Sequence, residues 1–257
     1  MAQVSISNAN KVFGSPVESG SAVEVLRDFT LEVSEGEFLV LFGPNACGKT
    51  TLLNAIAGLI SLDSGSISIG TTQSRTARIS YIFQDYRETI LPWRRVLDNI
   101  AYPLAIAGVN KQERHAIAIR LLKDMRILLP TDQWPGQLSG GQQQLLVITR
   151  ALISEPELML FDEPFNALDV EARIQMQHKL QYIWGKTGAT IIFVSHDLDE
   201  ALLLADRVVM LSRRPAQPVE IINVPFPRPR KQSLLEDSGF FEVRRHALKV
   251  FREIMAR

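Results

Sequence analysis

Residues 38–50 read FLVLFGPNACGKT, and the organisation of the whole chain can be worked out from this segment. Its first five residues are all apolar, which is typical of a strand buried on both faces of a sheet. Its last eight fit the pattern G-x-x-x-x-G-K-[ST], in which backbone N–H groups curl around phosphate oxygens. Residues 50–59 follow with apolar side chains at helical spacing. The segment therefore predicts a strand, a phosphate-binding loop and a helix whose positive N-terminus faces the loop.

The predicted loop offers nucleotide contacts from consecutive residues. They are Gly43, Pro44, Asn45, Ala46, Cys47, Gly48, Lys49, Thr50 and Thr51. We expect the Lys49 ammonium to bridge the β- and γ-phosphates and the Thr50 hydroxyl to hold Mg²⁺. A glycine-rich turn without a ligand is the alternative, and the strand and helix predicted on either side argue against it. Cys47 is either a small space-filling residue or a thiolate that makes nucleotide binding sensitive to thiol reagents.

Other segments predict the sheet to which this strand belongs. Residues 23–33, 158–161 and 190–194 are apolar enough for strands, and residues 34–36 form a turn before the central strand. The last two runs end in acidic or polar residues, at the sheet edge where open α/β proteins bind ligands. Residues 85–152 instead show helical periods broken by prolines, which predicts a helical insertion into an α/β core. After residue 211 we expect an extended basic stretch and an amphipathic helix at about 239–255.

An acidic pair, Asp162 and Glu163, directly follows the apolar run 158–161. Phosphoryl transfer needs an acid near Mg²⁺ and a group that positions the attacking water. We assign Asp162 to the first role and Glu163 to the second. Such a pair on its own is usually a solvated loop, and it is the phosphate loop earlier in the chain that favours the catalytic interpretation.

A second anion-binding turn precedes a helix predicted at residues 143–153. The segment Leu138-Ser139-Gly140-Gly141-Gln142 offers free N–H groups and a hydroxyl at a helix N-terminus. One nucleotide has no evident use for two such turns on one subunit, so we expect this turn to bind a nucleotide held by another copy. An ordinary helix cap by Ser139 is the alternative.

Composition restricts the class of protein further. The chain has 257 residues, with 28 Lys+Arg against 28 Asp+Glu and one cysteine. Balanced charge argues against a general nucleic-acid binder. The single cysteine excludes an internal disulfide or a Cys-only zinc site and suits a reducing compartment. No apolar run approaches the ~18–20 residues of a membrane span, and the start lacks a secretory pattern. We therefore expect a soluble protein that works at a membrane only by docking on another protein.

Together these motifs resemble the ATP-binding cassette (ABC) ATPases over about residues 4–211. The resemblance implies the α/β fold of P-loop NTPases, with a RecA-like core, an N-terminal antiparallel β subdomain and an inserted helical subdomain. It implies that Gln84 touches Mg²⁺ and the attacking water and that His196 contacts the γ-phosphate. It also implies that Asp169 lies in a loop crossing a dimer interface and that the Phe13 ring stacks on adenine.

The resemblance also suggests how the chain divides. We expect the first part of the nucleotide-binding core, with the β subdomain and phosphate loop, at residues 1–84, and a helical subdomain with the signature motif at residues 85–152. The second part of the core is expected at residues 153–224, and a basic tail with a short helix at residues 225–257. Three features depart from the family pattern. They are Ala46 where glycine is frequent, Asn166 where serine is usual, and Gln143-Gln144-Leu145 where an arginine is common. None of these departures removes a catalytic group.

In that family two ATPase subunits, here two copies or a copy and a paralogue, enclose two ATP molecules. Because no membrane span is predicted, closure of the dimer would move a separate permease, and residues 92–100, just after Gln84, are the natural docking surface. Residues 91–93, 96–100 and 225–230 look like the ATPases of nitrate, sulfonate, taurine and bicarbonate importers, which rely on a solute-binding protein. ATPases of thiamine-precursor uptake look alike here. The resemblance implies a peripheral place on the cytoplasmic face of the bacterial inner membrane.

Other classes explain the sequence less well. A cassette ATPase of DNA repair would separate its two halves by a long coiled coil, whereas here the phosphate loop and signature lie within 100 residues without sustained heptads. A tandem translation-associated cassette needs two motif sets, and a small P-loop kinase leaves residues 138–142 unexplained. We therefore expect no nucleic-acid partner. Basic residues of the tail could meet acidic lipid headgroups or form a solvated face; they are Arg228, Arg230, Lys231, Arg244 and Arg245.

Overall fold

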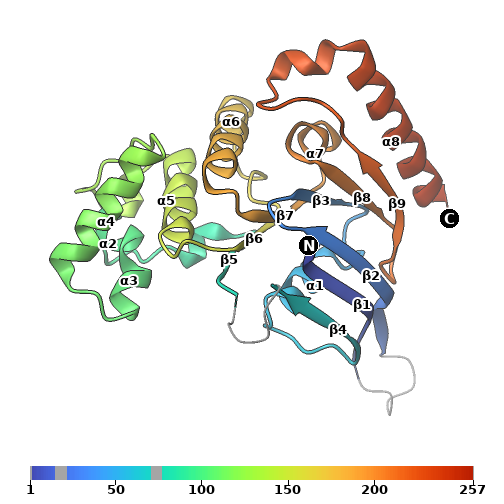
Figure 1. Cartoon of the computed structure of the whole chain (residues 1–257), viewed down its shortest axis with the longest axis horizontal. Helices are drawn as coiled ribbons and strands as arrows, with labels where there is room; N and C mark the ends of the chain where they lie inside the picture. The colour runs from blue at the N-terminus through green and yellow to red at the C-terminus, as the bar shows by residue number, and fades with distance from the viewer. Residues whose placement is uncertain (1, 15–21, 71–76, 257) are drawn as a thin grey trace. The chain divides into compact units, whose positions relative to one another are not determined.

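The computed structural model describes residues 2–14, 22–70 and 77–256 (Figure 1), and contacts divide this part of the chain into two compact units. The first unit joins the described residues up to Ala77 with those from Thr190 onward, and the second is Arg78–Ala189. Residues 153–189, predicted with the second part of the core, therefore group with the helical insertion. The four segments predicted from the sequence are finer than these units and stay a prediction.

The first unit is built on parallel strands. β3 (Phe38–Phe42) lies between β7 (Thr190–Ser195) and β8 (Arg207–Leu211) and runs parallel to both. All five β3 residues are buried, as expected of a strand covered on both faces. β9 (Pro218–Asn223) extends this sheet antiparallel to β8. The sequence reading missed β9, because proline usually argues against a strand and is tolerated only at the start of an edge strand such as this one.

A smaller antiparallel sheet completes the first unit. β1 (Ala2–Phe13) lies between β2 (Val23–Ser34) and β4 (Ser64–Ile69). Ile6 on β1 pairs with Leu31 on one side and with Ile67 on the other. Apolar side chains alternate with exposed ones along β2, so one face of the sheet is buried and the other meets solvent. This confirms the N-terminal antiparallel β subdomain.

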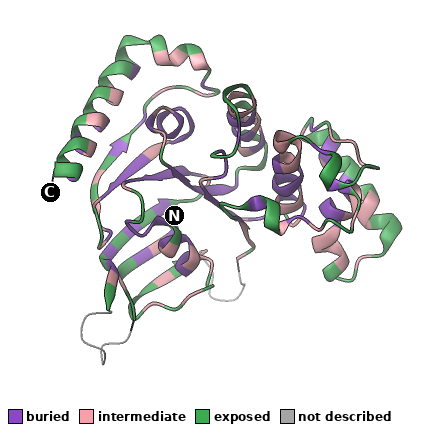
Figure 2. Ribbon diagram, turned by 180° about the vertical axis from the view of Figure 1, so that it is seen from behind, coloured by how far each residue is buried: buried purple, intermediate pink, exposed green. Residues whose placement is uncertain are grey.

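Helices of the first unit cover the parallel strands. α1 (Lys49–Ile56) begins at the phosphate loop and ends three residues before the predicted end. α7 (Leu198–Leu204) packs on β3, β7 and β8, and α8 (Ser238–Ala256) packs on α7, β8 and β9 (Figure 1). The core strands are buried along their length, whereas α8 shows exposed residues along its outer side (Figure 2). α8 confirms the predicted C-terminal helix.

The second unit is mainly helical. β5 (Ile79–Ile82) and β6 (Leu158–Asp162) pair in parallel. The helices are α2 (Val96–Ile100), α3 (Tyr102–Ile106), α4 (Lys111–Asp124), α5 (Gly140–Leu152) and α6 (Val170–Thr187). α5 begins earlier than predicted because the Ser139 side chain caps it. The sequence reading missed α6, which Asp169 caps. No helix among the described residues of either unit is long and apolar enough to cross a membrane.

Two arginines of the tail turn inward, so the expectation of a lipid-facing or solvated row is wrong for them. Arg230 is 3% exposed and donates hydrogen bonds to backbone carbonyls at the end of α7 and after β9. Arg228 donates to the Leu204 carbonyl and to the Asp206 carboxylate. Arg244 pairs with Asp199 near the start of α7. The tail is thus fastened to α7 by cations that meet carbonyls and carboxylates.

Candidate nucleotide-binding site

The predicted phosphate loop connects β3 to α1 and closes tightly. Gly48 has φ +130°, and a Cβ there would lie 2.9 Å from Val25 Cγ1 and 3.0 Å from the Val25 carbonyl oxygen. A Cβ on Gly43 would lie 2.9 Å from Leu211 Cβ. The two distances of 2.9 Å are shorter than real Cβ contacts allow, so only glycine fits at these two positions. The loop therefore owes its shape to close packing against β2 and the end of β8.

Lys49 lies inside this loop. Its side chain is 5% exposed, and its Nζ donates hydrogen bonds to the carbonyl oxygens of Gly43 and Pro44, each at 2.9 Å. These carbonyls are therefore turned toward a cation rather than toward an anion. The ammonium lies where the sequence predicted a cation that neutralises phosphate charge.

Ala46 explains one departure from the family pattern. Its φ is +58°, in the left-handed region where alanine is about 1–2 kcal/mol less favourable than in ordinary backbone. Its carbonyl oxygen accepts two hydrogen bonds from Arg214, from Nε at 3.0 Å and from Nη2 at 2.6 Å. The sequence reading missed Arg214. No local motif marks it, and it reaches the loop only because β8 ends beside β3.

Cys47 is a packing residue in this structure. It is 1% exposed, and burial raises the pKa of its thiol, although the nearby Lys49 and Arg214 cations act in the opposite direction. A buried thiol with a raised pKa is a poor nucleophile. The geometry therefore favours the space-filling interpretation over the reactive thiolate.

His196 and the phosphate loop border the same pocket. This open pocket has a volume of about 750 Å³ and is lined by residues 43–46, by His196 and by side chains that include Arg213 and Phe251. His196 is exposed on the turn between β7 and α7, and the next residue, Asp197, caps α7 by accepting from the Asp199 and Glu200 N–H groups. The first unit thus brings together the two elements that the sequence assigned to phosphate contact.

Phe13 lies at the end of β1, opposite Val23 of β2. Its ring is 43% exposed, and the Lys11 ammonium lies 5.4 Å from the ring centre. An exposed aromatic face is available for stacking, and the adenine contact itself stays a prediction.

Asp162 and Glu163 end β6 in the second unit, as predicted. Asp162 is 3% exposed, and burial together with this carboxylate raises the pKa of Tyr81 on β5. Glu163 has φ +45°, which turns the chain sharply after the strand. The Asn166 side-chain amide donates to Glu163 Oε2. The unusual Asn166 therefore orients the carboxylate to which the sequence assigned the attacking water.

The signature segment forms a complete helix cap. Ser139 Oγ accepts from the Gln142 N–H, and the Gln142 side-chain oxygen accepts from the Ser139 N–H at 2.9 Å. The capping alternative is therefore confirmed, and nucleotide binding by the same turn stays a prediction. Gln84 is exposed just after β5, and Asp169 is exposed at the start of α6, where it accepts from the Ala172 N–H at 2.8 Å.

Gln144 is a second residue whose role the sequence did not reveal. It is fully buried, and its Nε2 donates to the Pro164 carbonyl oxygen at 2.7 Å. The signature helix α5 is thereby linked to the residue that follows Glu163. A glutamine on a helix gives no signal of this kind in the sequence, because the acceptor lies 20 residues away.

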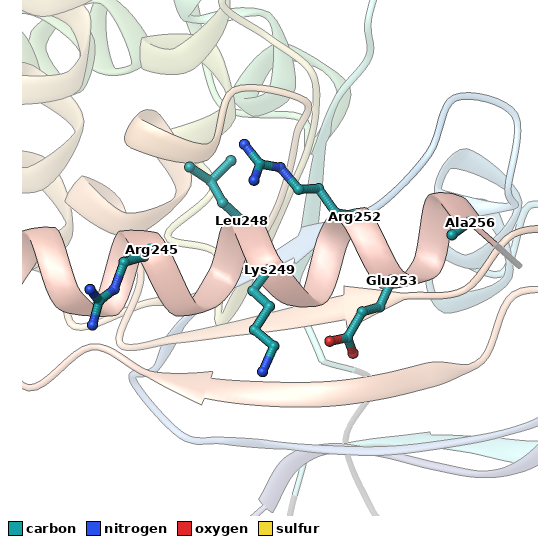
Figure 3. Close-up of a pocket in the computed structure, with 6 residues that line it drawn as sticks. All are labelled: Arg245, Leu248, Lys249, Arg252, Glu253 and Ala256. Carbon is teal, nitrogen blue, oxygen red and sulfur yellow. The ribbon is translucent and has the colours of Figure 1, made fainter.

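A different pocket of about 370 Å³ lies along the outer side of α8. Arg245, Lys249 and Glu253 line up along one side of the helix (Figure 3). All of the lining residues belong to α8, so this pocket shares nothing with the phosphate loop.

A buried strand, a glycine-shaped loop that surrounds a lysine, and the helix that follows define a P-loop nucleotide-binding protein. The family model described as ABC transporter matches residues 26–166, which is more than half of the chain. The chain belongs to the ABC transporter family.

Relatives of the chain are ATP-binding subunits. The chain is 39% identical over 236 residues to the taurine import ATP-binding protein TauB of Escherichia coli (strain K12), with 89% of this chain and 92% of that protein covered. It is 38% identical over 254 residues to the bicarbonate transport ATP-binding protein CmpD of Synechocystis sp., with 95% and 87% covered.

A solved structure supports the fold and the chemistry. It is a dimeric post-hydrolysis state of the ATP-binding cassette MJ0796 bound to ADP and Pi. It matches with a TM-score of 0.72 at 27% identity, and the match covers 87% of this chain and 100% of that one. The predicted fold class is therefore confirmed. The chain is an ATPase that binds and hydrolyses ATP.

Proposed function

We propose that this chain is the ATP-hydrolysing subunit of an ABC importer and that it drives a separate membrane permease. The observation that carries the proposal is the phosphate loop, in which Lys49 lies among loop carbonyls while His196 borders the same pocket. The names of TauB and CmpD support an importer of a small solute such as taurine, another sulfonate, nitrate or bicarbonate. An ATPase for thiamine-precursor uptake is the alternative, since an ATPase does not touch the solute.

The catalytic roles in this proposal are those that the sequence assigned, with Asn166 added. Lys49 and the loop N–H groups bind the phosphates, and Phe13 stacks on adenine. Glu163 polarises the attacking water. Asn166 orients the Glu163 carboxylate through its hydrogen bond to Glu163 Oε2. His196 contacts the γ-phosphate. Catalysis then consists of positioning and charge stabilisation, without a covalent enzyme intermediate.

Mg²⁺ fits the residues available. Among the described residues, no group of three or more His, Cys, Asp or Glu side chains could hold a metal ion by itself. Mg²⁺ in nucleotide sites needs no such group, because it binds through one or two protein ligands, substrate phosphates and water. We propose Thr50, Asp162 and Gln84 for this role. When bound, the ion neutralises charge that develops on the phosphates.

We further propose that two subunits enclose two nucleotides. Residues 139–142 at the start of α5 would bind the nucleotide held by the other subunit, and Asp169 would lie at the interface. The dimeric state of the similar cassette MJ0796 supports this arrangement. The second subunit would be a copy of this chain or a paralogue.

Trp93 is the proposed permease anchor. Its side chain is 69% exposed, and hydrogen bonds hold the loop on which it lies. Fully buried Asn99 accepts from the Leu91 N–H at 3.0 Å and donates to the carbonyls of Leu91 and Arg94 at 3.0 and 2.9 Å. An exposed tryptophan on a fixed loop can bind a partner helix with little loss of entropy.

The proposal also covers the location of the subunit in the cell and its partners. The subunit would lie peripherally on the cytoplasmic face of the bacterial inner membrane. A solute-binding protein would act on the permease rather than on this chain. We propose no nucleic-acid partner, because the net charge is zero.

The test is a pull-down of the tagged protein from detergent-solubilised membranes, followed by mass spectrometry. Recovery of a polytopic permease supports the importer, and recovery of nucleic-acid or ribosomal partners alone contradicts it. Trp93→Ala should leave ADP affinity unchanged and lose the permease. Phe241→Ala removes an aromatic ring that is 52% exposed on α8, outside residues 92–100, and is a control that should retain both. Equal loss of nucleotide binding in Trp93→Ala would show that Trp93 serves the ATPase fold and not the permease.

A further inference from the structure

The Ala46 carbonyl of the phosphate loop is held by a residue from outside the loop. Nε and Nη2 of Arg214 both donate to this oxygen, across 168 residues of sequence. We propose that Arg214 is a positioning residue, which fixes the loop in its nucleotide-binding conformation without touching the nucleotide. The proposal deepens the proposed function, because it concerns the same site.

The loop needs such an anchor for a stereochemical reason. A loop that points N–H groups at phosphate must direct its carbonyls elsewhere, and buried or half-buried carbonyls need donors. The carbonyls of Gly43 and Pro44 find one in Lys49 Nζ. Ala46 is exposed, and its carbonyl finds two donors in Arg214, which take the place of water. Because Ala46 has φ +58°, which alanine disfavours, the anchor also holds a conformation that the side chain itself opposes.

Lys49 cannot serve as a constant anchor. Its ammonium has three donors, and in the proposed reaction it turns some of them to the β- and γ-phosphates. The bonds to Gly43 and Pro44 then compete with the nucleotide. Arg214 also lines the pocket beside the loop, but its Nε and Nη2 are already turned to the Ala46 carbonyl. We therefore expect these two bonds to persist through the cycle.

Arg214 is itself presented by a well-held turn after β8. The Ser212 N–H donates to the Gln217 carbonyl at 2.9 Å, and Ser212 Oγ donates to the Pro215 carbonyl at 2.8 Å. The Ala216 N–H donates to the Val25 carbonyl on β2 at 2.8 Å. Neighbouring Arg213 donates to the Met255 carbonyl in the last turn of α8 at 2.6 Å. A side chain on so fixed a base loses little entropy when it binds the loop.

The cysteine next to Ala46 provides a direct readout. Cys47 is the single cysteine of the chain and is 1% exposed. A chromogenic disulfide reagent such as DTNB can reach the thiol only when the loop opens. The labelling rate without nucleotide therefore measures loop opening and needs neither ATP turnover nor a permease.

Arg214→Ala should label about fivefold to tenfold faster than the wild type and bind ADP about fivefold more weakly, as expected for loss of hydrogen bonds from a charged, exposed donor. The melting temperature should stay within about 2 °C of wild type, because the residue lies on the surface. Arg214→Lys and Arg214→Gln each keep a donor and should recover part of both properties. Arg245→Ala removes another exposed arginine, which is paired with Glu242 on α8, and should behave as wild type.

Three results would overturn the proposal. The first is wild-type labelling and wild-type ADP affinity in Arg214→Ala. The second is equal acceleration in Arg245→Ala, which would attribute the effect to surface charge in general. The third is wild-type behaviour in Arg214→Lys with no recovery in Arg214→Gln, since charge alone would then explain the result. The labelling rate does not depend on ATP turnover. A wild-type protein without ATPase activity would therefore contradict the proposed function, while the labelling of Arg214→Ala would still test the role of Arg214.

Discussion

Replacement of Arg230 by alanine should lower the free energy of unfolding by about 3–5 kcal/mol. The Arg230 side chain is 3% exposed and carries its guanidinium into the first unit. Nη1 donates to the carbonyls of Leu202 and Ala205, Nη2 to those of Val224 and Phe226, and Nε also to that of Phe226. Burial, followed by the charge of Arg228, lowers the pKa of Arg230 to about 10, so the group is still charged at neutral pH.

The magnitude follows from what the substitution leaves behind. Alanine leaves four backbone carbonyls without this donor, and each buried unsatisfied group costs about 1–3 kcal/mol. Relief from burying a charge offsets part of the loss, and water entering the vacated volume satisfies some of the carbonyls. The low end of the range for each carbonyl, summed over four, gives about 4 kcal/mol.

Urea denaturation followed by circular dichroism measures the change. Arg230→Met keeps most of the volume but none of the donors, so it should lose nearly as much stability as the alanine variant. Lys231→Ala, at the exposed neighbouring position, should change stability by less than about 0.5 kcal/mol. A loss below about 1 kcal/mol in Arg230→Ala, or full recovery in Arg230→Met, would refute the carbonyl argument.

Two further predictions concern the ATPase cycle. Glu163→Gln should bind ATP with near wild-type affinity and turn over at about 1% of the wild-type rate or less, because the carboxylate that positions water is lost. Phosphate release measures the turnover rate. Near-normal turnover would mean that another group positions the water. Ser139→Ala should lower the free energy of unfolding by about 1 kcal/mol through loss of the α5 cap. If the same turn also binds nucleotide across a dimer, this variant should lose ATP-dependent dimerisation in size-exclusion chromatography, whereas retained dimerisation would leave Ser139 with capping alone.

The parts of the fold that the sequence predicted well are those with a local cause. The phosphate loop follows from glycines and a lysine within eight residues, and β3 follows from an unbroken apolar run. α8 follows from helical spacing and needed no knowledge of its partners. β9 was missed because its support is the neighbouring strand β8, whereas its own proline, Pro218, argues against a strand.

The parts of the site that the sequence did not predict depend on distant acceptors. Arg214 and Gln144 have no motif around them, and each acquires its role from a carbonyl that the fold brings close, at Ala46 and at Pro164. Arg230 was assigned to the surface because arginine is usually exposed. Backbone carbonyls at the end of α7 accept hydrogen bonds from Arg230 and so favour its burial. A sequence pattern does not reveal which carbonyls need a side-chain donor.

The order of strands has a consequence for biosynthesis. β3 pairs with β7 and β8, so about 170 residues must be made after β3 before the second of its neighbours, β8, is complete. At a translation rate of about 5–20 residues per second, this interval lasts roughly 10–30 s. A fully apolar strand thus stays without its final partners on the nascent chain during that time. Synthesis of this protein should therefore depend on chaperones that bind the emerging chain, and slow translation should increase its aggregation.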